Sequence, residues 1–185
     1  MPRRAVVVQP ETENRAKKWI PHIRNMPLER ETKQARPTGR SLRILVQAIN
    51  VLTKSHIKGK VPIYPSFQTV RSCIVRTAKP FSAKGRVGLK IKVYDPNGSG
   101  SLHTVHIYQI KDGTEAPTLS KATRPLLTCD CGHWVYTCEA AMFKHKYAEL
   151  LRANDVFAPV TNPRLRPVCC KHVMRAIAYV LKEKL

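Results

Sequence analysis

Two short motifs near the C-terminus contain residue types that bind metals. The first is Cys129-Asp-Cys131 and the second is Cys170-Lys-His172, with 38 residues between them. Thiolates and imidazole are the ligands that zinc prefers in a closed tetrahedral site. The two cysteines of a C-x-C pair converge where the backbone bends, and Gly132 favours such a bend. The spacing predicts one metal ion bound by Cys129, Cys131, Cys170 and His172.

The metal and the ligand set both have alternatives. Thiolates also bind iron–sulfur clusters, in which a histidine can replace a cysteine. Cys138 and Cys169 lie close to the two motifs in sequence, as do His133 and His145. Cys169 is a weaker candidate than Cys170, because two adjacent cysteines do not easily bind the same ion. The remaining alternative is that all of these cysteines are reduced residues of the core.

The predicted site has no free coordination position. A catalytic zinc usually keeps one position open for water or substrate, whereas four protein ligands indicate a structural ion. The sequence contains no H-E-x-x-H, G-x-S-x-G or P-loop motif. We therefore expect a protein that is not an enzyme and has no small-molecule substrate.

The C-terminal segment, residues 121–185, must place these ligands. We expect a helix over residues 138–152 with Thr137 as its N-cap, a proline-containing loop over residues 154–167, and a final helix from Lys171 to Lys184. This arrangement puts the C-x-H pair where a helix begins. A segment of this size has a small core, and a bound metal would add the stability that the core lacks.

The middle segment, residues 41–120, shows both helical and strand periodicity. Leu42, Leu45 and Ile49 share one face of a helix that begins after Ser41 and ends near Lys54. Residues 68–77 are predicted to form a strand, with Cys73 as a small buried residue. Residues 87–93 alternate between apolar and polar, a turn follows at residues 96–100, and a second strand returns over residues 102–110. These features predict a β-hairpin at the centre of a sheet.

Residues 1–40 contain five prolines and charges of both signs. Each proline lacks an amide hydrogen and disfavours helix at the preceding residue, so a long helix is excluded. An extended arm that packs on a neighbouring subunit and a disordered tail are the two alternatives. The predicted fold class is therefore α+β, with a proline-rich N-terminal arm, a small domain with one helix and a hairpin-centred sheet, and a C-terminal helical knuckle stapled by metal.

The chain is strongly basic, with 33 Lys and Arg against 12 Asp and Glu and a formal net charge of +21. Such a charge attracts polyanions, either nucleic acid or an acidic protein. No apolar run approaches the ~18 residues of a membrane span, so we expect no membrane partner. Residues 41–128 hold 14 basic and 3 acidic residues. The residues we expect to contact DNA or an acidic neighbour are Lys58, Lys60, Arg71, Arg76, Lys84, Arg86, Lys90 and Lys92.

The C-terminal motifs resemble those of two groups of proteins. C-x-C followed by C-x-H is similar to SWIM-type zinc-binding domains. The longer pattern C-D-C, an aromatic residue, a helix, T-N-P (Thr161 to Pro163) and C-K-H resembles the metal knuckle of virion structural proteins from large contractile-tailed bacteriophages. This resemblance covers about residues 127–184 and implies a tail, baseplate or neck subunit of the virion that assembles with other subunits. The SWIM likeness implies instead a zinc-dependent nucleic-acid-binding protein.

Overall fold

The computed structural model describes residues 41–54, 65–98, 100–149, 151, 162 and 165–185. Its centre is a four-stranded antiparallel sheet in the order β1-β2-β3-β4, so each strand pairs with the next one in sequence. The strands are β1 (Ile74–Ala83), β2 (Arg86–Tyr94), β3 (Leu102–Ile110) and β4 (Leu126–Cys129). The α-helices are α2 (Leu42–Lys54), α3 (Phe67–Ser72), α4 (Glu139–Lys144) and α6 (Lys171–Glu183). The fold class is α+β, as predicted.

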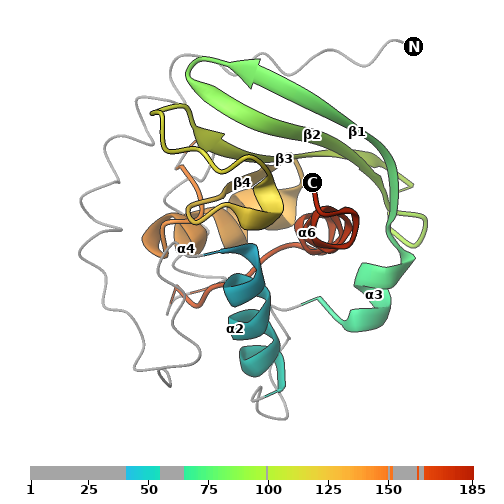
Figure 1. Ribbon diagram of the computed structural model, residues 1–185. Coiled ribbons are helices and arrows are strands. Elements are labelled where there is room, and N and C mark those ends of the chain that lie inside the picture. The colour runs from blue at the N-terminus through green and yellow to red at the C-terminus, as the bar shows by residue number, and fades with distance from the viewer. Residues whose placement is uncertain (1–40, 55–64, 99, 150, 152–161, 163–164) are drawn as a thin grey trace.

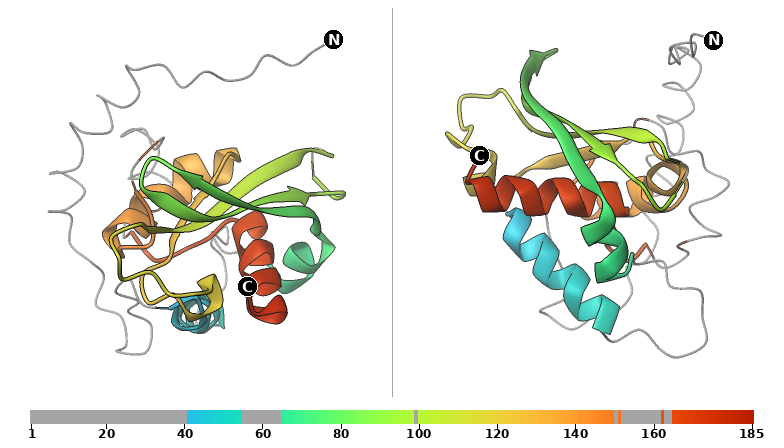
Figure 2. Two further views of the ribbon diagram at one scale, coloured as in Figure 1. Left: turned by 45° about the horizontal axis from the view of Figure 1, so that its top comes forward. Right: turned by 90° about the vertical axis from the view of Figure 1, so that its right-hand side faces the viewer.

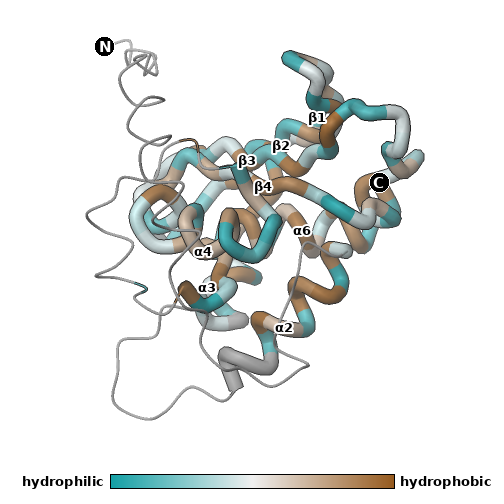
Figure 3. The backbone as a smooth tube through the Cα atoms, turned by 90° about the vertical axis from the view of Figure 1, so that its left-hand side faces the viewer, coloured by the Kyte–Doolittle hydropathy of each residue, from teal (hydrophilic) through white to brown (hydrophobic). Residues whose placement is uncertain are grey.

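The predicted β-hairpin is confirmed as β2 and β3. Their register pairs Ile91 with Val105 and Leu89 with Ile107, which places apolar residues of both strands on the same face. Figure 3 shows polar and apolar residues alternating along the strands. Gly88 allows the two strands to approach, because a Cβ at this position would overlap the carbonyl oxygen of Ile107. The face that carries Ile91 and Val105 is called the inner face below.

The final helix α6 covers the inner face and contacts all four strands. Its apolar stripe includes Val173, Ile177 and Val180, which are fully buried. Helix α2 packs on α6 on the side away from the sheet, as Figure 1 and the right view of Figure 2 show. The predicted helix from Ser41 to Lys54 is therefore confirmed, and the Leu45 amide donates to the carbonyl of Ser41. The metal-binding segment is thus positioned by the core of the molecule.

The predicted strand over residues 68–77 is wrong in its first half. Ser66 caps a short helix there, since its hydroxyl accepts a hydrogen bond from the amide of Thr69 at 3.1 Å. Strand β1 begins only at Ile74 and continues through Pro80. A proline is tolerated because β1 is an edge strand, where one amide of every pair has no partner strand. Cys73 is fully buried as expected, although it lies between the helix and the strand.

The predicted helix over residues 138–152 is also wrong at both ends. The chain already turns helically from Gly132 and continues through a π-helical turn η3 (Trp134–Cys138) that leads into α4. Thr137 therefore lies inside a helical turn and is not an N-cap. The helix ends at Lys144, and Lys146 adopts a positive φ of 63°. The carbonyl of Tyr147 then accepts a hydrogen bond from the amide of Leu127 in β4 at 2.8 Å, which replaces the next helical bond.

The N-terminal arm and most of the loop over residues 154–167 lie outside the described residues. The division of the chain at residue 121 remains a prediction. What the fold shows is that the C-terminal segment supplies both β4, which extends the sheet beside β3, and α6, which covers its inner face.

Candidate metal centre

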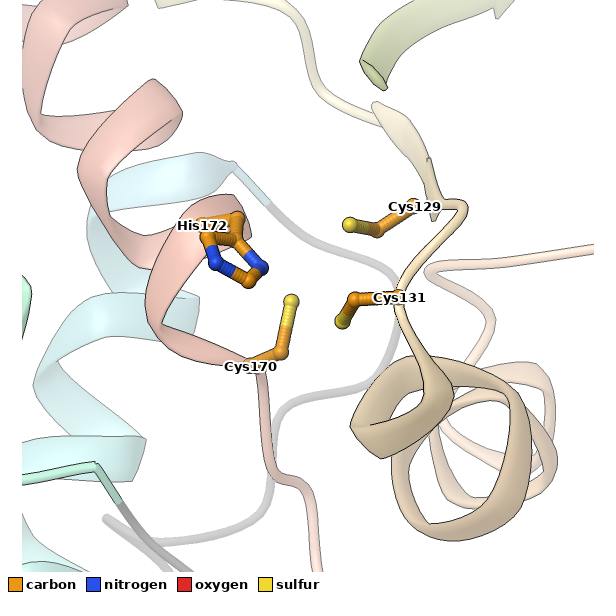
Figure 4. A group of neighbouring side chains, drawn as sticks. All are labelled: Cys129, Cys131, Cys170 and His172. Carbon is orange, nitrogen blue, oxygen red and sulfur yellow. The ribbon is translucent and has the colours of Figure 1, made fainter. Parts of the chain in front are cut away.

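The four predicted ligands lie together at one end of the sheet. Their ligand atoms are all within 4.8 Å of one another, and all four residues are buried. Figure 4 shows Cys129 and Cys131 facing Cys170 and His172 across a small gap. Sulfur atoms around a single tetrahedral zinc are about 3.8 Å apart, given a Zn–S bond of about 2.3 Å. The group therefore has the size that one metal ion requires.

The first pair is placed by the end of strand β4. Cys129 is the last residue of the strand, and the next residue, Asp130, anchors the turn. Both carboxylate oxygens of Asp130 accept from the amide of Thr104 in β3, at 3.0 Å each. The amide of Trp134 donates to Sγ of Cys131 at 3.4 Å. Both cysteines are thus turned toward the same point by hydrogen bonds to the sheet and to η3.

The second pair is placed by the start of α6. Cys170 is the N-cap of the helix, and its Sγ accepts from the amide of Val173 at 3.5 Å. His172 is the second residue of the helix and points to the same side as Cys170 (Figure 4). The positive end of a helix dipole stabilises a thiolate at the N-cap. The prediction that a helix begins at the C-x-H pair is confirmed.

The imidazole of His172 lies beside polar groups but makes no hydrogen bond to any described residue. Both of its ring nitrogens are buried without a hydrogen-bond partner among the described residues. The ring stacks on His103, with centroids 4.0 Å apart and an angle of 30° between the planes. Oδ2 of Asp95 lies 3.7 Å from Nε2 of His172. A buried imidazole without hydrogen bonds is costly unless it binds something else, so the ring fits a metal ligand.

Two residues that sequence reasoning missed support this ring. Asp95 is almost fully buried at the end of β2 and forms an ion pair with Lys171. Burial raises the pKa of Asp95, but the hydrogen bond and the charge of Lys171 outweigh burial and hold the pKa below its usual value. His103 is held by Asp130, with 3.2 Å between its Nδ1 and the carboxylate. Such outer partners orient metal ligands, and here they depend on strand register, which no local motif encodes.

Ionising all three clustered cysteines together is unfavourable without a cation, because like charges would lie side by side in a buried site. Hydrogen bonding to Cys131 raises the pKa of Cys129, and desolvation raises the pKa of Cys170. Hydrogen bonds from those two thiols lower the pKa of Cys131. The protein alone thus favours one thiolate stabilised by two neutral thiols. A divalent cation would remove this conflict, because it stabilises every thiolate that it binds.

The neighbouring cysteines are not members of this group. Cys138 and Cys169 are fully buried, and desolvation raises the pKa of both thiols. Both pack in the same hydrophobic core as the ligand cysteines, but neither belongs to the group of converging ligand atoms. Buried neutral cysteines behave as small apolar side chains, and this explains both residues without metal binding.

The predicted basic contact residues fall in several places. Arg71 lies on α3, Lys84 lies in the turn between β1 and β2, and Arg76 lies where the pairing of β1 with β2 shifts. Arg86, Lys90 and Lys92 are on β2, whereas Lys58 and Lys60 lie outside the described residues. The structure brings a further lysine, Lys79, directly opposite Lys90. Had the sequence pattern predicted a strand through residue 80, it would have placed Lys79 on the same face as Lys90, but Pro80 argues against a strand there.

Comparisons of the chain with protein-family models, with characterised proteins and with solved structures found no match. Among the described helices, none has the length and apolar character needed to cross a membrane. The buried Cys3His group therefore carries the functional argument.

Proposed function

We propose that one zinc ion, bound by Cys129, Cys131, Cys170 and His172, serves as a structural staple in a protein that is not an enzyme. The observation that carries this proposal is the convergence of four buried ligand atoms within 4.8 Å. Four protein ligands complete a tetrahedral zinc and leave no position for substrate. Zinc is favoured over an iron–sulfur cluster, because a cluster of several irons and sulfides needs more space between its ligand sulfurs than one ion.

The staple would join two parts of the chain that are distant in sequence. Cys129 and Cys131 follow β4, whereas Cys170 and His172 begin α6, the helix that covers the inner face of the sheet. A metal bound to both pairs fixes the start of α6 on the edge of the sheet. The free energy of metal binding would then contribute directly to folding.

At the level of the whole protein, we propose a structural subunit of a tailed-phage virion, in the tail, baseplate or neck. The resemblance of residues 127–184 to virion metal knuckles supports this role. The net charge of +21 suits acidic neighbouring subunits or packaged DNA. The alternative is a SWIM-type zinc-dependent nucleic-acid-binding protein, and the lysines of β2 favour it.

Elemental analysis and an absorption spectrum of the protein, purified under low oxygen without added metal, test the metal proposal. We expect about one zinc per chain and no visible colour. Several irons per chain with a brown absorption near ~400 nm would replace the zinc by an iron–sulfur cluster. Fully folded protein without any bound metal would contradict the staple.

Quantitative mass spectrometry of purified virions tests the virion role. A fixed copy number relative to the tail proteins, retained after a high-salt wash, is expected for a subunit. A chain that is abundant in infected cells and missing from particles would favour the nucleic-acid-binding alternative.

A further inference from the structure

The face of the sheet opposite α6 has a different composition from the inner face. It is called the outer face here and includes the side chains of Thr77, Lys79, Phe81, Lys90, Lys92, Tyr94, Thr104, His106 and Tyr108, as the alternation along the paired strands requires. The left view of Figure 2 looks toward it, and no described helix crosses in front of β1 and β2.

Two lysines of the outer face stand directly opposite each other. Lys79 of β1 pairs with Lys90 of β2, and both are exposed. Like charges at directly opposed positions of an antiparallel pair destabilise the sheet. Neither lysine forms an ion pair with any described residue. Folding alone does not account for this arrangement, whereas an anion bound between the two ammonium groups would.

The positive charge continues along the strand. Lys92 follows Lys90 on the same face after two residues, a distance of about 6.8 Å. Its ammonium group donates to the hydroxyl of Thr104 at 2.8 Å, which orients it across β3. The three residues Lys79, Lys90 and Lys92 form an L-shaped group, with one step across the strands and one along β2, that is called the lysine stripe below. Three ammonium groups this close together suit a ligand with repeated negative charges.

Apolar and aromatic side chains flank the lysine stripe at both ends. Beyond Lys92, Ile74, Tyr94 and Leu102 form one row across three strands, and Ile74 and Leu102 are 41% and 50% exposed. The guanidinium of Arg76 lies over the ring of Tyr94, 5.0 Å from its centroid. At the other end, Phe81 is half-buried and meets the ring of His106 edge to face at 5.1 Å.

We infer that the outer face binds single-stranded nucleic acid, with phosphates on the lysine stripe and unpaired bases against Tyr94 and Phe81. Phosphates supply the repeated negative charge, and bases supply flat apolar surfaces that stack on aromatic rings. An acidic peptide would match the lysines but would leave the half-buried rings and the apolar row without a counterpart. A duplex keeps its bases stacked inside, so it would use the lysines alone. This site lies beyond the metal centre and requires only that the sheet is folded.

Fluorescence anisotropy with a labelled oligothymidylate of about 12 nucleotides tests this inference. The variant Lys79→Glu/Lys90→Glu is compared with Lys121→Glu/Lys182→Glu, which changes the net charge equally. Both control lysines are exposed and lie on η2 (Leu119–Lys121) and α6, elements of the inner side. We expect the outer-face variant to bind at least about 10-fold more weakly, with a salt dependence reduced by about 1.4 in log–log slope, and the control to lose less than about 3-fold.

A second probe separates the rings from the phosphates. An abasic oligonucleotide of equal length carries the same charge and no bases, so the wild-type protein should bind oligothymidylate more tightly. Tyr94→Leu should remove most of this difference without altering the salt dependence. Zinc content and thermal unfolding, measured for each variant, distinguish failure of this inference from failure of the metal staple.

Three results would overturn the inference. Equal losses in the two charge variants would mean that only net charge matters. Tighter binding to a duplex of the same length, or to an acidic peptide, would mean a different partner. Equal affinity for oligothymidylate and the abasic strand would mean that no base contacts the rings.

Discussion

The two faces of the sheet differ in whether folding alone explains their residues. On the inner face, Ile91 and Val105 are fully buried under α6. On the outer face, Lys79 and Lys90 oppose each other without an acidic partner among the described residues. Residues of the inner face are therefore explained by stability. The lysine pair costs stability, and the nucleic-acid site inferred above would account for it.

A contrast within the outer face supports the same conclusion. Arg86 is bound by both carboxylate oxygens of Glu149, at 2.8 and 3.1 Å, and the hydroxyl of Tyr108 donates to the same carboxylate at 2.7 Å. One cation of this face thus has an acidic partner within the protein. Among the described residues, Arg86 has an acidic partner and Lys79 and Lys90 have none. Three variants test this contrast between the two faces.

The largest effect is expected at the metal centre. Cys170→Ala removes a ligand and the cap of α6, and should lower the free energy of unfolding by about 3 kcal/mol or more in the presence of zinc. The matched control is Cys169→Ala, the adjacent and equally buried cysteine outside the ligand group. Cys169→Ala should lower the free energy of unfolding by about 1 kcal/mol, because it removes a sulfur atom from the core. Urea unfolding monitored by circular dichroism measures both values.

A chelator sharpens this test. Stripping the metal should destabilise the wild type and Cys169→Ala strongly, and should barely change Cys170→Ala, which has already lost the site. If the chelator destabilises all three proteins equally, the metal is bound elsewhere.

The ligands of this site were predictable because their spacing is local. A C-x-C turn and a C-x-H helix start each keep two ligands within three residues, and only their meeting depends on the fold. The hairpin was predictable for the same reason, since the apolar residues of β2 alternate without interruption. Asp95 and His103 reach the metal centre through the register of β2 and β3, which no short motif records. Lys79 was missed because Pro80 argues against a strand, although an edge strand accepts it.

The second expected effect concerns the ion pair between Arg86 and Glu149. Hydrogen bonding to Glu149 raises the pKa of Arg86. Burial raises the pKa of Glu149, but its hydrogen bonds from Arg86 and Tyr108 prevail and lower it. At neutral pH, Glu149→Gln should lower the free energy of unfolding by about 1 kcal/mol, a value that allows for the partial exposure of the pair.

The pH dependence of this cost has a defined sign. A carboxylate whose pKa is lowered in the folded protein stabilises it fully above the unfolded value, about 4.3. The stabilisation is lost as the pH falls through the lower, folded pKa. The difference between wild type and Glu149→Gln should therefore be constant from pH 6 to 8 and should shrink below about pH 4. A difference that persists unchanged in acid would mean that the variant acts through packing.

The smallest effect is the most informative, because its sign separates folding from binding. Lys79→Glu places a carboxylate opposite Lys90 and converts a like-charged pair into an opposite-charged one. The free energy of unfolding should rise by about 0.2–1 kcal/mol, and the gain should shrink in high salt. The same variant should bind oligothymidylate more weakly. A substitution that stabilises the protein and weakens the complex shows that the lysine pair is kept for its ligand, whereas a loss of stability would place Lys79 with the structural residues of the inner face.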